Sequence, residues 1–122
     1  MKVAIIGSRG IIHVNIEKYL PNECTEIVSG GARGIDTVAT VFAKERNIKL
    51  TEFLPLYERY GRAAPIVRNK QIVEYADAVI AFWDGKSRGT KSVIDYCRKL
   101  KKTCTIICIS KEMCKTDDSL LS

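Results

Sequence analysis

Short apolar runs that alternate with stripes of apolar residues at helical spacing constrain the fold of this chain more than any other feature. Residues 3–6 and 78–83 are apolar at every position, which is typical of strands buried on both faces of a sheet. Residues 26–28, 48–54 and 103–109 predict three further strands. The segments between these runs carry apolar residues three and four positions apart, as amphipathic helices do.

Strands that alternate with helices predict a parallel sheet with helices on both faces, an α/β fold of the Rossmann-like, three-layer type. Because crossovers between parallel strands are right-handed, the simplest order of the five strands is 3-2-1-4-5. We place the third strand at an edge, since Lys49 and Glu52 make it less apolar. The 122 residues fit one domain of this Rossmann-like fold, assigned to residues 1–110, followed by a C-terminal tail at 111–122.

The helices and one long connection are predicted from spacing and from proline. The first helix is expected to carry Ile12 and Ile16 on its buried face and to end at Pro21. Residues 55–63 are expected to form a loop. Pro65 suits the first turn of the third helix, where its missing N–H is not needed.

Three glycine-containing loops follow strands that the predicted order makes neighbours. They are residues 7–10, 29–36 and 84–90, and each combines glycine with a hydroxyl and an arginine. The carboxyl ends of parallel strands meet at one edge, beside the point where the winding reverses, and ligands of such sheets bind there. Backbone N–H groups, hydroxyls and arginines suit phosphate, while Asp36 and Asp84 would accept from ribose hydroxyls or a base amine. The alternative is that the glycines serve only the strand-to-helix turns.

Two common nucleotide signatures are absent. The dinucleotide fingerprint G-x-G-x-x-G does not follow the first strand. Gly85-Lys86-Ser87 resembles the end of a Walker A loop, but that motif needs glycine where Ile80 stands inside a strand. We therefore reject an ATPase or GTPase.

Aromatic residues near the loops have two interpretations. Tyr57 and Tyr60, together with Arg62, would form a lid that stacks on a base, or would pack over the edge of the sheet. Trp83 would belong to the core, or would form a wall of the cleft.

The net charge and the cysteine content limit the possible binding partners and the cellular compartment of the protein. The net charge of +6 favours anionic partners without choosing between nucleotides and nucleic acid. The five cysteines are odd in number, no pair is spaced C-x-x-C, and there is one histidine, so we expect no metal site and a reducing, cytoplasmic setting. Cys104 and Cys108 lie in an apolar run and are expected to be buried thiols. The start of the chain does not read as a signal peptide, and no run is long enough for a membrane span.

Four segments together resemble the SLOG superfamily, which includes the DNA-processing protein A family and the LOG-type cytokinin-activating phosphoribohydrolases. They are VAIIGSR at 3–9, IVSGGARGID at 27–36, RN at 68–69 and FWDGKSRGT at 82–90. The nearest resemblance is to the small, single-domain branch of the superfamily, and it covers residues 1–109. It implies a Rossmann-like fold that binds nucleotides or their derivatives through these loops, with Arg68, Gly89 and Thr90 at the phosphate end.

The loops and the resemblance together define the candidate ligand-binding residues. They are Gly7, Ser8, Arg9, Ser29, Gly30, Gly31, Arg33, Gly34, Asp36, Arg68, Asn69, Asp84, Ser87, Arg88, Gly89 and Thr90.

One departure from the LOG-type pattern bears on catalysis. Those hydrolases resemble this chain up to the threonine, after which they carry glutamates that assist cleavage of the base–ribose bond. Here residues 91–94 contain no acid, and Asp95 is expected to be rotated away from the site. No catalytic residue is assigned.

The sequence as a whole predicts a sensor or ligand-binding module that takes a nucleotide as ligand and requires no cofactor. The alternatives are an N-glycosidase that acts on nucleoside monophosphates and a protein that binds single-stranded DNA. Homo-oligomerisation stays open.

Overall fold

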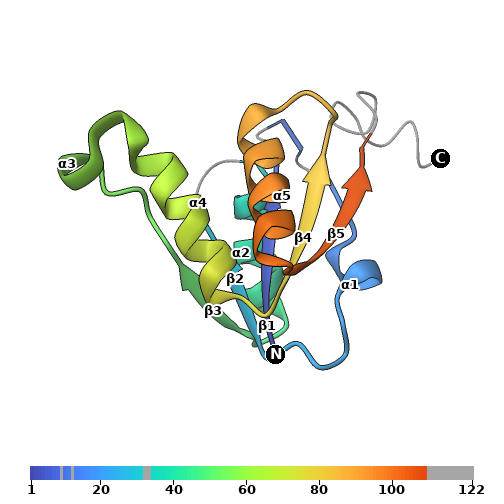
Figure 1. The fold of residues 1–122 in the computed structure, drawn as a ribbon. Coiled ribbons are helices and arrows are strands. Elements are labelled where there is room, and N and C mark those ends of the chain that lie inside the picture. Colours follow the sequence, from blue (N-terminus) through green and yellow to red (C-terminus); the bar gives the residue numbers. More distant parts are fainter. Residues whose placement is uncertain (9, 12, 32–33, 110–122) are drawn as a thin grey trace.

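The computed structural model describes residues 1–8, 10–11, 13–31 and 34–109, and it contains one five-stranded sheet (Figure 1). The strands are β1 (Lys2–Gly7), β2 (Glu26–Ser29), β3 (Lys49–Glu52), β4 (Ala78–Trp83) and β5 (Thr103–Cys108). All neighbouring pairs are parallel, and the order is β3-β2-β1-β4-β5. The predicted fold class and strand order are confirmed.

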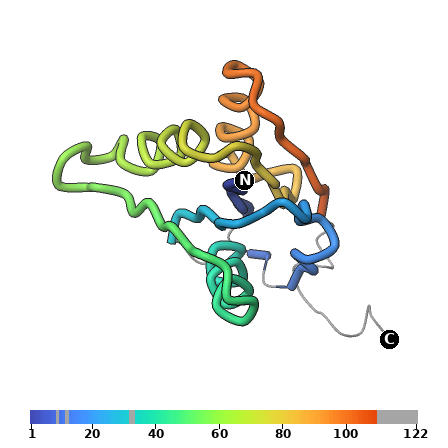
Figure 2. The backbone as a smooth tube through the Cα atoms, turned by 90° about the horizontal axis from the view of Figure 1, so that it is seen from below, coloured from blue at the N-terminus to red at the C-terminus, as the bar shows by residue number. Residues whose placement is uncertain are grey.

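Helices cover both faces of this sheet. They are α1 (Ile16–Tyr19), α2 (Ile35–Glu45), α3 (Tyr57–Tyr60), the 3-10 turn η1 (Gly61–Ala63), α4 (Ala64–Tyr75) and α5 (Arg88–Leu100). Figure 2 shows α4 and α5 on one side of the sheet and α2 on the other. Pro65 lies in the first turn of α4, as predicted.

The core consists of two apolar layers, one on each face of the sheet. Successive side chains of a strand point to opposite faces, so Ile5 packs in the layer that contains α2 while Ala4 packs in the layer beneath α4 and α5. Phe82 is fully buried in the first layer, and Val79 is almost fully buried in the second. Each large aliphatic or aromatic side chain buried in this way contributes about 1.5–3 kcal/mol of hydrophobic stabilisation.

The first helix is much shorter than the spacing predicted. It begins at Ile16, because the side chain of Asn15 caps it by accepting the backbone N–H of Lys18 at 3.3 Å. Pro21 follows so closely that the helix completes one turn. Ile12, which the prediction placed on the same helix face, lies outside the described residues.

The prediction of a loop at residues 55–63 was wrong for most of its length. Residues 57–63 form α3 and η1, and none of their side chains is buried. A helical turn without a buried face has no apolar periodicity, so the pattern could not reveal it. Figure 1 shows α3 at the far end of an arm that projects from the sheet.

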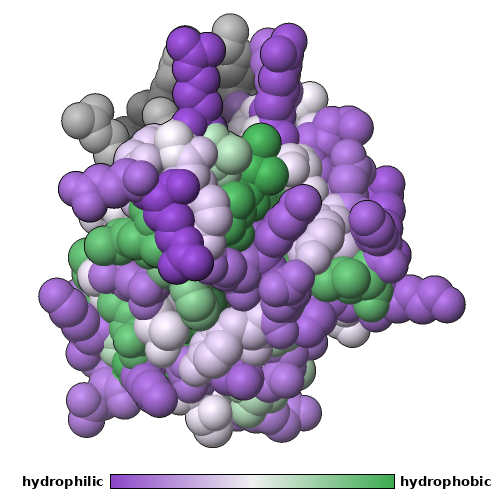
Figure 3. All heavy atoms as spheres, turned by 60° about the vertical axis from the view of Figure 1, so that its left-hand side comes forward, coloured by the Kyte–Doolittle hydropathy of each residue, from purple (hydrophilic) through white to green (hydrophobic). Residues whose placement is uncertain are grey.

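The surface on the side of this arm is mainly polar. Figure 3 shows hydrophilic residues over most of this face, interrupted by separate apolar patches. Leu54, Leu56 and Ile66, in and beside the arm, are about half exposed. Within the described part of the chain, no helix combines the length and the apolar character needed to cross a bilayer.

The cysteines differ in burial from the expectation. Cys97 is buried and Cys104 is partly buried, whereas Cys108 is exposed. The prediction that Cys108 is a buried thiol was wrong, because β5 is an edge strand in which no residue is fully buried.

Candidate functional site

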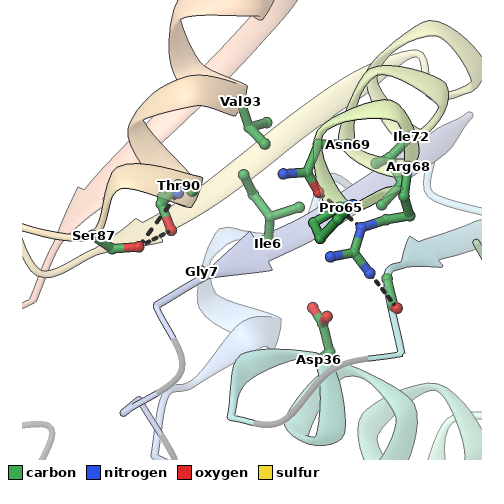
Figure 4. Close-up of a pocket in the computed structure, with 12 residues that line it drawn as sticks. Ile6, Gly7, Asp36, Pro65, Arg68, Asn69, Ile72, Ser87, Thr90 and Val93 are labelled. Atoms are coloured by element: carbon green, nitrogen blue, oxygen red, sulfur yellow. Dashed lines mark hydrogen bonds between the residues drawn. The ribbon is translucent and has the colours of Figure 1, made fainter. Parts of the chain in front are cut away.

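A pocket of about 140 Å³ opens at the carboxyl edge of the sheet, beside the reversal of winding between β1 and β4 (Figure 4). Its walls come from β1, the β2–α2 connection, the start of α2, one side of α4 and the start of α5. The lining residues are Ile6, Gly7, Gly30, Asp36, Pro65, Arg68, Asn69, Ile72, Ser87, Gly89, Thr90 and Val93. The pocket therefore lies where the topology of an open α/β sheet places a ligand.

The structure brings together part of the predicted set. The predicted residues that line the pocket are Gly7, Gly30, Asp36, Arg68, Asn69, Ser87, Gly89 and Thr90. Those that do not line it are Ser8, Ser29, Gly31, Gly34, Asp84 and Arg88. Arg9 and Arg33 lie outside the described residues.

Sequence reasoning missed the apolar wall of the pocket. Ile6, Pro65, Ile72 and Val93 all face it. Ile6 is the last residue of the apolar run in β1, and the others lie on helices among residues expected to serve the core or the helix start. No signal in their residue types separates a pocket wall from a core, so only the three-dimensional arrangement identifies them.

Arg68 joins α4 to the loop after β2. Its Nη1 donates to the carbonyl oxygen of Gly30 at 2.7 Å, and its Nε donates to Oδ1 of Asn69 at 2.9 Å. A Cβ at position 30 would lie 2.6 Å from Nη1, so glycine is what allows the guanidinium to lie across the loop. Figure 4 shows the guanidinium at the pocket wall, with the amide of Asn69 beside it on the side of α5.

Asp36 supplies the carboxylate of the pocket. It stands in the first turn of α2, is 8% exposed, and points into the cavity from the side opposite α4 (Figure 4). The positive end of the helix dipole favours an ionised carboxylate at this position. An acceptor thus faces the donors Arg68 and Asn69 across the cavity.

Asp84 serves its own loop instead of the pocket. Its Oδ1 accepts the backbone N–H groups of Lys86 and Ser87, both at 2.8 Å, and these bonds lower the pKa of the carboxyl group. The indole N–H of Trp83 donates to the carbonyl oxygen of Ser87 at 3.0 Å, and Ser8 Oγ accepts the backbone N–H of Asp84 at 3.3 Å. These four contacts fix the shape of the β4–α5 connection and join it to Trp83 at the end of β4 and to Ser8 after β1.

The β4–α5 connection leads into α5 and places the first turn of that helix at the pocket. Ser87 caps the helix by accepting the backbone N–H of Thr90 at 3.4 Å, and its hydroxyl also bonds to Thr90 Oγ1 at 3.3 Å. Gly89 follows in the first turn with no atom near the site of a Cβ, so this part of the rim is open. The amino end of a helix attracts anions through its dipole and its free N–H groups.

A larger groove on the outer side of α2 lacks this chemistry. It has a volume of about 560 Å³ and is lined mainly by Val14, Ile16, Val38, Val41 and Phe42. The polar side chains in its lining are those of Thr37 and Glu45, and among the residues that the structure describes no lysine or arginine lines it. The pocket at the carboxyl edge is therefore the better candidate for a polar ligand.

No group of three or more histidine, cysteine, aspartate or glutamate side chains within the described ranges is placed to hold a metal ion. Among the described residues, the pocket offers hydrogen bonding and charge from the carboxylate of Asp36, the guanidinium of Arg68, the amide of Asn69 and the start of α5 with its hydroxyls at Ser87 and Thr90.

Fold and pocket define the class as a doubly wound, parallel α/β protein with a polar pocket at its topological switch point. Comparison of the chain with protein-family models, with curated proteins and with solved structures gives no match.

Proposed function

We propose that the chain binds a nucleotide or a nucleotide-derived phosphorylated ligand in this pocket and serves as a sensor or ligand-binding module. The observation that carries the proposal is the meeting of three groups at the switch point of the sheet. They are the start of α5, the side chains of Arg68 and Asn69, and the buried carboxylate of Asp36.

Each group has a natural partner on such a ligand. The start of α5 and Arg68 would bind the phosphate, because both present donors to an anion. Asp36 would accept hydrogen bonds from ribose hydroxyls. Ile6 and Val93 line the same pocket and offer an apolar surface to the sugar or base.

Binding without chemistry is the better-supported form of this function. No acid lines the pocket from α5, and Asp95 is exposed and paired with Lys91 at 3.2 Å. One observation favours the alternative of an N-glycosidase for nucleoside monophosphates: Asp36 places a buried carboxylate in the pocket, and such a group can stabilise a cationic transition state. Free base released by the wild type and not by Asp36→Asn would establish that activity.

Binding is tested by thermal unfolding and calorimetry against nucleoside monophosphates, cyclic nucleotides and inorganic phosphate. A ligand at about 100 times its Kd stabilises the folded state by roughly 2.7 kcal/mol, which raises the Tm by several degrees. Gly89→Glu is expected to abolish the shift, because a carboxylate at the rim repels phosphate while suiting the first turn of a helix.

Asn22→Glu is the matched control, since it adds the same charge at an exposed position before β2, at the opposite edge of the sheet. This variant should bind as the wild type does. The proposal is wrong if no nucleotide shifts the Tm, or if oligonucleotides bind and mononucleotides do not.

A further inference from the structure

A second depression adjoins the pocket and runs between α4 and α5. It has a volume of about 260 Å³ and shares Asn69 and Val93 with the pocket, so these two residues form the boundary between them. Lys70, on α4, and Lys99, on α5, both line this depression. We call it the α4–α5 groove.

The groove is cationic because its one acidic lining residue already has a partner. Asp95 is in an ion pair with Lys91. Among the described residues, neither Lys70 nor Lys99 is in an ion pair. The Nζ of Lys70 lies 5.6 Å from the centre of the Tyr96 ring, and that phenol donates to Glu74 at 2.6 Å, so the ring is held in place as the floor under the ammonium group.

Both helices that carry these lysines begin at the pocket, where Pro65 of α4 and Gly89 of α5 line it. Cβ atoms of a helix tilt toward its amino end, so the Cα–Cβ bond of Lys99 is inclined toward the pocket. Lys99 is nine residues after Thr90, about 13.5 Å along the helix axis. Lys70 directly follows Asn69, a residue of the shared boundary.

The volumes of the pocket and the α4–α5 groove give an independent reason to treat them as one binding site. The pocket alone is smaller than typical small-ligand sites, which measure roughly 300–1,000 Å³, whereas the pocket and groove together fall within that range. A ligand that fills only the pocket would leave most of its surface in water.

We propose that the α4–α5 groove binds a second phosphate group of the ligand whose first phosphate lies at the start of α5. The ligand class is a nucleotide that carries two phosphates separated by a sugar. The source of the second phosphate is a free nucleoside bisphosphate or the next unit of a dinucleotide. This inference rests on the proposed function, since the first phosphate must occupy the pocket.

Calorimetry with matched ligands tests the groove. For each of the four bases, the affinities of the nucleoside 5′-monophosphate, the 3′,5′-bisphosphate and the 5′-phosphorylated dinucleotide are compared. The second phosphate should strengthen binding by about two- to fivefold at low salt, as one exposed ion pair does. In the double variant Lys70→Ala/Lys99→Ala this advantage should vanish while monophosphate affinity stays within twofold. The control Lys18→Ala/Lys44→Ala removes two exposed lysines from α1 and α2 and should keep the advantage.

The outcomes separate this inference from the proposed function. If monophosphates bind and a second phosphate adds nothing, the inference is overturned and the proposed function stands. If the double variant weakens monophosphate and bisphosphate binding equally, the lysines act on the pocket as a whole and the inference is again overturned. If no nucleotide binds, both fail. Preference for the bisphosphate over the dinucleotide, or the reverse, identifies the source.

Discussion

The carboxylate of Glu26 has three side-chain partners, and the residue lies at the amino edge of the sheet, away from the pocket. Tyr75 and Thr51 donate hydroxyl hydrogen bonds to its Oε2, at 2.5 and 2.7 Å, and Lys49 lies 3.6 Å from Oε1. The hydrogen bond from Tyr75 is the largest cause of a lowered pKa, followed by that from Thr51. The carboxylate therefore ties β2, β3 and α4 together.

This network predicts a pH-dependent stability. Because the folded-state pKa of Glu26 is lower than its ordinary value of 4.5, its stabilising effect is complete above that value and is lost as the pH falls through the folded-state pKa. Glu26→Gln should lower the free energy of unfolding by about 1 kcal/mol at pH 7. The gap to the wild type should shrink below pH 4.5, as urea denaturation at several pH values will measure.

The comparison between wild type and variant isolates Glu26, since other carboxyl groups with lowered pKa values, such as Asp77, are common to both. Glu58→Gln, on the exposed turn α3, removes the same charge outside the network and should follow the wild-type pH curve. A gap that stays constant from pH 7 to pH 3 would contradict the prediction.

At the scale of elements, variants in the β4–α5 connection distinguish two roles for Asp84, one in stabilising the loop and one in binding the ligand. If its carboxylate serves the loop, Asp84→Asn keeps Oδ1 as the acceptor for Lys86 and Ser87 and should cost little stability. Asp84→Ala loses both bonds and should cost about 1–3 kcal/mol. Chemical denaturation of the two variants measures the difference.

Ligand binding gives a second readout for the same pair of variants. Asp84→Asn is expected to retain the affinity of the wild type, because Asp84 does not line the pocket. A large loss of affinity in this variant with stability unchanged would instead support the sequence-based reading, in which Asp84 accepts hydrogen bonds from the ribose or the base.

The elements also show where sequence reasoning succeeds. Strands such as β4 are predicted because their apolar character is set by burial on both faces, a property of the residues themselves. The turn α3 was missed because it buries nothing, and the length of α1 was overestimated because the cap at Asn15 outweighed the apolar spacing. The sequence could not show that Asp84 stabilises its own loop instead of lining the pocket. An aspartate that caps a turn and an aspartate that binds a ligand occur in the same kind of local sequence.

For the whole molecule, the topology followed from general rules, but the boundaries of the pocket did not. Alternating strands and helices specify the order of the sheet, and that order brings the glycine loops to one edge. Whether Arg68 reaches the loop at Gly30 depends on the tilt and distance of α4, which no periodicity encodes.

The layering of the molecule predicts an order of thiol reactivity. Cys108 is exposed and should react with a thiol reagent in the native protein. Cys97 is buried, and its pKa is raised by its contact with the Cys104 thiol and by burial, so it should react only on unfolding. In a Cys114→Ser background, peptide mapping after brief labelling measures both rates.

Cys108→Ser in the same background is the control, and it should remove the fast reaction. Rapid native labelling of Cys97 would contradict the packing of α5 against the sheet.

The pairing of β1 with β4 has a consequence for synthesis. Val3 pairs with Ala78, so one of the two partners of the central strand β1 is synthesised some 75 residues after it. While the ribosome is still translating α4, β1 can pair with β2 on one side, but its other edge has no partner, and an unpaired apolar edge is a template for association with other chains. The time that translation takes to pass β4 therefore sets how long each nascent chain is exposed to this hazard.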